Sequence, residues 1–145
     1  IKDCSIKQSD TPGSVRVIVS CPGELTSEEL EGIKKAFPQI ELFGVKIRFE
    51  YAKKTHVSIK VKANVDSISD EASQKKEIYD NIYEILTRNK INYNISLDEI
   101  RKAALKIDSV QSVEISGTNV LGDCILCDGD GYILLDNLEV ELYEC

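Results

Sequence analysis

The chain has 145 residues, 42% hydrophobic and 30% charged, so it can bury the core of one domain or of two very small ones and is not a disordered chain. Its formal net charge of -7 argues against a protein that grips a nucleic-acid backbone, because such proteins cluster Lys and Arg against phosphates. The sequence also lacks an apolar run of the roughly 20 residues that cross a bilayer.

The N-terminal residues are polar and end in a Thr-Pro-Gly-Ser turn, so residues 1–14 are predicted to be a linker or tail. The sequence has no methionine, and we therefore expect a processed chain or a piece of a longer protein that lacks its N-terminal portion.

Residues 15–19 form a Val-rich, nearly alternating run that predicts a strand. After Pro22-Gly23, the stretch from Thr26 to Glu29 has the pattern of a capping box, in which the Thr side chain and the Glu side chain each satisfy a backbone N–H. A short amphipathic helix is predicted from there, carrying Leu30, Ile33 and Phe37 on one face and ending at Pro38.

Two runs of strict alternation follow, at residues 45–51 and 57–65, and each places its apolar side chains on one face of a sheet. The connector at residues 52–56 is short enough to predict an antiparallel hairpin.

A second helix is predicted to begin at Ser69 or Asp70 and to fray near Asn89. Another capping box, Ser96 to Glu99, predicts a third helix. The apolar positions of the two helices are Ala72, Tyr79, Ile82, Ile85 and Leu86, then Leu97, Ile100, Ala104 and Ile107.

Strands are predicted at residues 110–115, 132–135 and 138–143, the last two as a closing hairpin. The sequence therefore predicts an α+β fold of two small subdomains, at residues 15–66 and 67–145. Each is expected to be a mainly antiparallel sheet packed with one or two helices.

The segment GDCILCDGDG, residues 122–131, contains the residue types of a metal or redox site. A structural zinc site needs four ligands, and Cys124 and Cys127 lack a second Cys or His pair nearby in the sequence. A reactive thiolate needs a lowered pKa, which the neighbouring carboxylates oppose. We interpret the segment as a short strand and a turn, and keep a small metal-binding or redox protein using Cys124 and Cys127 as the alternative.

Asp128 begins a pattern like an EF-hand calcium loop, but Ile133 stands where that loop requires glycine, so the match fails. The single histidine, His56, follows two lysines and is expected to be solvated rather than catalytic. We expect no enzymatic activity and no cofactor.

Charged side chains alternate along three of the predicted strands and are candidates for contact with partners. The basic set is Lys46, Arg48, Lys60 and Lys62, beside Lys53 and Lys54, and the acidic set is Glu139, Glu141 and Glu144. A solvated sheet face explains such a pattern, and a binding surface for an acidic partner is the alternative. Opposite charges on two faces would also suit head-to-tail assembly of copies.

The order of these features resembles the C-terminal portion of the Baseplate J-like family, the wedge proteins of contractile phage tails and related particles. The matching features are the strand at residues 15–19, Pro22-Gly23, the cap from Thr26 to Glu29, Pro38, and Gly44-Val45. The long helix from Asp70, residues 91–100, the run Val110-Gln111-Ser112-Val113 and the strands up to Tyr143 continue the pattern.

The resemblance implies a structural subunit of a baseplate wedge, without a catalytic site. Its partners would be other baseplate or tail subunits, and head-to-tail copies of itself. The net charge and the hydropathy argue separately against nucleic acid as a partner and against a membrane span. It would reside in a virion or phage-like particle that assembles in the bacterial cytoplasm, a setting that also suits free thiols.

Overall fold

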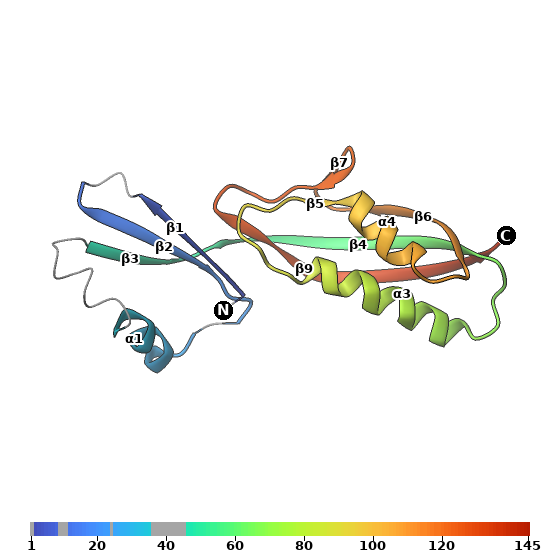
Figure 1. Ribbon diagram of the computed structural model, residues 1–145, viewed down its shortest axis with the longest axis horizontal. Coiled ribbons are helices and arrows are strands. Elements are labelled where there is room, and N and C mark those ends of the chain that lie inside the picture. The colour runs from blue at the N-terminus through green and yellow to red at the C-terminus, as the bar shows by residue number, and fades with distance from the viewer. Residues whose placement is uncertain (1, 9–11, 24, 36–45) are drawn as a thin grey trace.

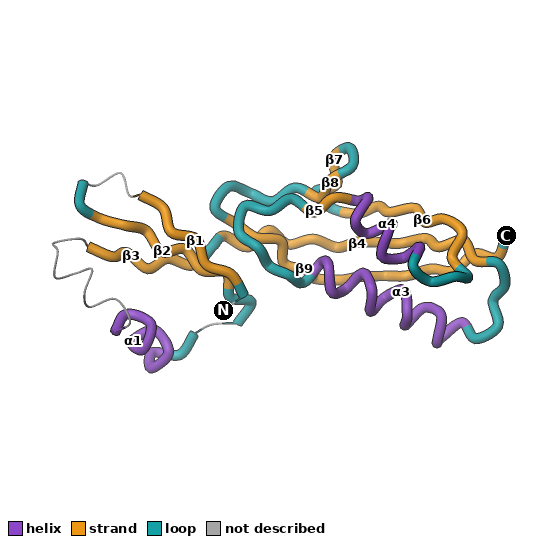
Figure 2. Tube along the Cα trace, in the orientation of Figure 1, coloured by secondary structure: helices purple, strands orange, loops and turns teal. Residues whose placement is uncertain are grey.

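The computed structural model describes residues 2–8, 12–23, 25–35 and 46–145, which form an α+β fold with three small sheets. Figure 1 shows an elongated molecule, with the first sheet at one end and the larger, helix-covered sheet at the other. The division into strands and helices is drawn in Figure 2.

The first sheet contains β1 (Asp3–Gln8), β2 (Ser14–Ser20) and β3 (Lys46–Tyr51), in that spatial order. β1 is antiparallel to β2, and β2 is parallel to β3. The prediction of a linker or tail over residues 1–14 is therefore wrong for residues 3–8, which are paired along their whole length with β2. Their polar composition reflects a strand at the edge of the sheet, where much of the surface stays in water.

Between β2 and β3 lies helix α1 (Ser27–Lys35). The predicted capping box is confirmed, since Thr26 N–H donates to Glu29 Oε2 at 3.0 Å and Glu29 N–H donates to Thr26 Oγ1 at 3.2 Å. The predicted end of this helix at Pro38, and the position of Phe37, lie outside the described residues.

The predicted hairpin of residues 45–65 is wrong, because β3 is followed by β4 (Lys53–Val65) with only Ala52 between them. Ala52 N–H donates to the carbonyl of Val19 on β2, at 2.7 Å. The next residue, Lys53, donates its N–H to the carbonyl of Asp130, just before β9, at 3.3 Å. The residues that resembled a connector continue the alternation of a strand, with Thr55 buried between exposed neighbours.

The second sheet has the order β6-β4-β9, with β6 at Val110–Gly117 and β9 at Gly131–Glu144. β4 is antiparallel to β6 and parallel to β9. The chain thus passes from one sheet to the other at Ala52, so the predicted boundary at 66/67 does not coincide with the boundary between the sheets.

The predicted closing hairpin is also wrong, because residues 131–144 form the single strand β9. The register steps from Val57 opposite Leu135 to Ser58 opposite Asn137, which leaves Asp136 as an extra residue. Such a β-bulge shifts the phase of the alternation, and this phase shift is what resembled a turn in the sequence.

Helices α3 (Glu71–Leu86) and α4 (Leu97–Leu105) pack on one face of the second sheet. Asp70 caps α3 by accepting from Ser73 N–H at 3.2 Å. Ser96 caps α4 by accepting from Asp98 N–H at 3.2 Å, but Glu99 does not complete the predicted box and binds Arg88 instead, at 2.7 Å.

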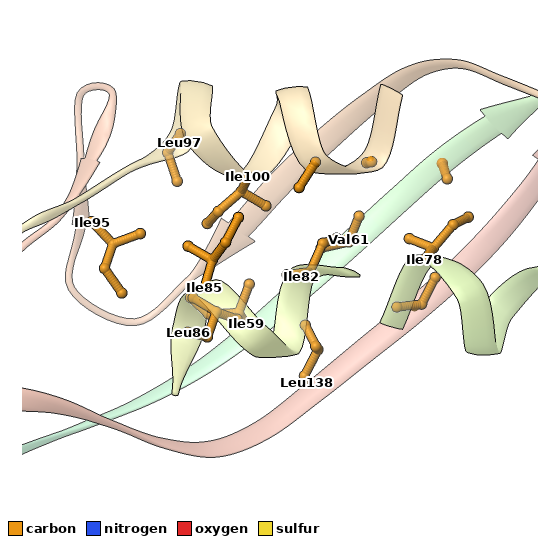
Figure 3. Close-up of a cluster of buried hydrophobic side chains, with 14 of the residues drawn as sticks. Ile59, Val61, Ile78, Ile82, Ile85, Leu86, Ile95, Leu97, Ile100 and Leu138 are labelled. Carbon is orange, nitrogen blue, oxygen red and sulfur yellow. The ribbon is translucent and has the colours of Figure 1, made fainter. Parts of the chain in front are cut away.

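The main core lies between these helices and the sheet, as Figure 3 shows. From α3 it takes Ile78, Ile82 and Leu86, and from α4 it takes Ile100, each with no exposed surface. Ile78 was missed by the predicted stripe, whereas Ala72 is exposed. Full burial of one such side chain stabilises the fold by about 1.5–3 kcal/mol.

A third, small sheet lies beside α4 and contains β5 (Ile95–Ser96), β8 (Cys124–Ile125) and β7 (Val120–Leu121), in that order. Both of its pairings are antiparallel. The short strand predicted within residues 123–127 is therefore confirmed as β8.

Candidate functional site

Residues 122–131 contain the short strand β8 and end at Gly131, the first residue of β9. Gly122 has a φ of +60°, a conformation that glycine adopts without strain, and it turns the chain from β7 into β8. Cys124 then lies opposite Leu121 and Ser96 in the small sheet. The cysteine pair is thus divided between a strand and the turn that follows it.

The two thiols are free and partly buried. Burial raises the pKa of the Cys127 thiol above its ordinary value, and the charge of Asp128 adds to the effect. The backbone N–H of Cys127 donates to Asn94 Oδ1 at 3.0 Å, and this hydrogen bond fixes the turn. Over residues 2–8, 12–23, 25–35 and 46–145, no three His, Cys, Asp or Glu side chains are placed to hold a metal ion.

The Asp128–Gly131 turn is fixed by hydrogen bonds within itself and to β4. Gly131 N–H donates to the Asp128 carbonyl at 3.0 Å, and Asp128 N–H donates to Thr55 Oγ1 at 3.1 Å. Asp130 has a φ of +56°, a left-handed conformation that Asp and Asn tolerate better than other side chains. The predicted turn is therefore present, with its left-handed position at Asp130 rather than at a glycine.

The carboxylate of Asp130 gathers polar groups from distant parts of the chain. It accepts a hydrogen bond from Lys7 Nζ on β1, lies 3.7 Å from Arg16 Nη1 on β2, and accepts from Asn92 Nδ2 at 3.4 Å. Its own N–H donates to Asn92 Oδ1 at 2.6 Å. The Lys7 hydrogen bond, followed by that of Asn92, lowers the pKa of Asp130. We call this set of four residues the Asp130 junction.

Two further bonds join the first sheet to the loop after α3. Asp3 Oδ2 accepts from Ile91 N–H at 2.8 Å, and Ser20 Oγ donates to the Asn89 carbonyl at 2.6 Å. Beside them, Ile18, Ala52 and Tyr132 form a small buried cluster. The segment that resembled an active site is therefore part of the contact between the two larger sheets.

Sequence reasoning missed the Asp130 junction. One signal was present, since the segment between α3 and α4 has asparagines at 89, 92 and 94, and asparagine is the residue that most readily replaces glycine in left-handed turns. Asn89 and Asn92 have φ values of +53° and +57°.

His56 lies on β4 at the bulge, where its Nδ1 is 2.8 Å from Asp136 Oδ1. Both side chains are at least half exposed to solvent. This position agrees with the prediction that the histidine is solvated.

Of the predicted basic set, Lys46 and Arg48 lie on β3 and are exposed. β3 forms the edge of the first sheet among the described strands, and both side chains lie on the same side of it.

Lys60 and Lys62 lie on β4, in the second sheet, directly opposite Glu139 and Glu141 of β9. Lys60 Nζ is 2.9 Å from Glu141 Oε1, and this hydrogen bond raises the pKa of the lysine and lowers that of the glutamate. The expectation that these basic and acidic residues occupy two opposite faces is wrong. They are cross-strand neighbours on one face, because β9 pairs with β4.

The structure has a hollow of about 340 Å³ near the start of β4, lined by Cys21, Gly23, Leu25, Tyr51 and Lys54. A groove of about 330 Å³ runs between α3 and β9, lined by Lys75, Lys76, Tyr79 and Val140. Among the described helices, none is both long and apolar enough to cross a membrane.

Neither a protein-family model nor a curated protein sequence matches the chain.

Proposed function

We propose that the chain is a structural, non-enzymatic component of the baseplate wedge of a contractile phage tail or phage-like particle, acting through protein–protein contacts. The observation that supports this most is the order of elements from β2 to β6. Strand, Pro-Gly turn, capped helix, long helix and short capped helix follow the pattern by which the sequence resembles the Baseplate J-like family, whereas the paired strands and the closing hairpin of that pattern are here β3 and β4, which lie in different sheets, and the single strand β9.

The mechanical character of the fold supports the same role. β3 and β4 run almost without interruption from one sheet into the other, and the Asp130 junction ties the sheets a second time. Two connections restrict the movement of one sheet relative to the other, which suits a structural subunit. Among the strands that the structure describes, those at the sheet edges offer backbone groups to partner proteins.

Within this proposal, the partners are other baseplate and tail subunits, and the particle assembles in the bacterial cytoplasm. The test is to purify intact particles from cells that encode the chain and to identify their proteins by mass spectrometry. The chain is expected at a fixed ratio to the other baseplate proteins. Recovery of the chain only outside the particles would contradict the proposal.

The alternative is a metal-binding or redox role for Cys124 and Cys127. The raised pKa of Cys127 opposes a reactive thiolate, because the protonated thiol is a poor nucleophile and a poor ligand. Elemental analysis of the purified chain would distinguish the two. About one zinc per chain, lost in the Cys124→Ser, Cys127→Ser double variant, would favour the alternative.

A further inference from the structure

The C-terminal part of β9, residues 137–144, forms an open edge of the second sheet. β9 pairs with β4 on one side, and among the described strands it has no neighbour on the other. Cys145 N–H donates to the Val65 carbonyl on β4, at 3.0 Å. Since successive residues of a strand alternate in direction, the N–H and C=O groups of Leu138, Val140 and Leu142 point toward the open edge.

The two faces of this edge differ in chemistry. Leu138 and Val140 are buried on the face that α3 covers, where the groove of Lys75, Lys76, Tyr79 and Val140 opens beside β9. Glu139 and Glu141 alternate with them on the other face. Among the described residues, Glu141 is paired with Lys60, and Glu139 is exposed and forms no salt bridge of its own.

The glutamates discriminate between possible occupants of the edge. If β9 of a second copy paired antiparallel about Val140, Glu139 of each copy would face Glu141 of the other, and like charges directly opposite each other destabilise a sheet. A strand with Lys or Arg at alternate positions would instead place a cation beside each carboxylate. Apolar residues between those cations would point toward the groove beside α3.

We propose that this edge binds, by strand addition, an extended segment of a partner protein in which basic and apolar residues alternate. The backbone of Leu138, Val140 and Leu142 supplies the hydrogen bonds, the groove takes an apolar side chain, and Glu139 and Glu141 select for basic side chains. The inference deepens the proposed assembly role and rests on it for the partner being another particle protein.

The test uses the full chain and a fluorescent peptide with the sequence of residues 57–65, VSIKVKANV, which already pairs with β9 from the other side. A second peptide carries Glu at both lysine positions. Fluorescence anisotropy is expected to show tighter binding of the lysine peptide, by about tenfold or more, since one or two ion pairs separate the peptides. Equal binding of the two peptides would overturn the proposal.

Two variants localise the effect. Glu139→Lys is expected to weaken binding of the lysine peptide and strengthen that of the glutamate peptide. Glu114→Lys makes the same charge change at an exposed position on β6, at the opposite edge, and is the matched control. Equal losses in both variants would show that net charge alone governs binding and would refute the assigned edge.

Amide hydrogen exchange tests the strand geometry independently. Bound peptide is expected to slow exchange at Leu138, Val140 and Leu142. Unchanged exchange there would rule out strand addition. If the chain binds the peptide but is missing from purified particles, this inference stands and the proposed function is contradicted. If the chain is present in the particles but does not bind the peptide, the proposed function stands and this inference is contradicted.

Discussion

Replacing Gly131 with alanine tests whether the segment of residues 122–131 is a packed corner of the fold. A Cβ at Gly131 would lie 2.7 Å from the carbonyl oxygen of Lys53 and 3.0 Å from that of Asp128. Ordinary carbon–oxygen contacts begin at about 3.3 Å, so the two carbonyls would have to retreat by about 0.6 and 0.3 Å. Both are backbone atoms, and Asp128 O accepts the N–H of Gly131 itself, at 3.0 Å.

This crowding is expected to destabilise the protein by about 1–3 kcal/mol, the usual cost of overpacking a site that cannot yield. Gly129 provides a control two residues away, since no atom lies within 4 Å of its would-be Cβ and its φ lies outside the left-handed region. Gly129→Ala is expected to be neutral, or to stabilise by up to about 1 kcal/mol through the unfolded chain. Gly122→Ala meets no atom within 4 Å but has a φ of +60°, and should cost about 1–2 kcal/mol by strain alone.

Urea unfolding of the three variants, followed by far-ultraviolet circular dichroism, measures these differences as shifts of the midpoint at constant slope. If Gly131→Ala and Gly129→Ala differ by less than about 0.5 kcal/mol, the ordinary scatter of surface substitutions, the loop is not packed against β4 as described.

Three further predictions concern the core, the pH dependence and the thiols. Ile82→Ala should cost about 2–5 kcal/mol in urea unfolding because the side chain is fully buried, whereas Leu105→Ala, at a position 46% exposed, should cost far less. The hydrogen bond from Arg88 lowers the pKa of Glu99, so this pair stabilises the fold at neutral pH, and the contribution is lost as the pH falls below the ordinary value of 4.5. Glu99→Gln should therefore flatten acid unfolding in that range, and an unchanged profile would contradict the assignment. Because burial raises the pKa of Cys127, iodoacetamide should modify it more slowly at neutral pH than the exposed Cys4, as mass spectrometry of the labelled chain would show.

Sequence reasoning succeeded where local physics decides the structure. The starts of α1 and α3 follow from Thr26, Glu29 and Asp70, whose side chains satisfy backbone groups within the same turn. The alternation of apolar residues also located β2 and β4.

Sequence reasoning failed where pairing over long distances decides the structure. Residues 52–56 have the length and polarity of a hairpin connector, yet Ala52 bonds to Val19 of β2 and residues 53–56 pair with β9. The bulge at Asp136 interrupts the alternation within β9, so the sequence predicted two strands where the structure has one. Neither arrangement leaves a local signature, because the paired residues are far apart in the sequence. Residues of β2 and β3 that pair are more than 30 positions apart, and those of β4 and β9 are more than 70 positions apart.

The charged residues illustrate the same limit. Lys60 and Glu141 were each identified as exposed and charged, but their pairing depends on β9 lying parallel to β4. The Asp130 junction depends on Lys7, which lies on β1. The polar composition of β1 predicted a linker or tail instead of a strand, so this contact could not be anticipated.

Locating the chain within purified particles tests the central claim most directly. Particles from cells that encode the chain, labelled with antibodies against it and examined by electron microscopy, should carry the label at the baseplate end of the tail. Label along the sheath or at the head, or particles that assemble normally without the chain, would contradict the assignment to the baseplate wedge.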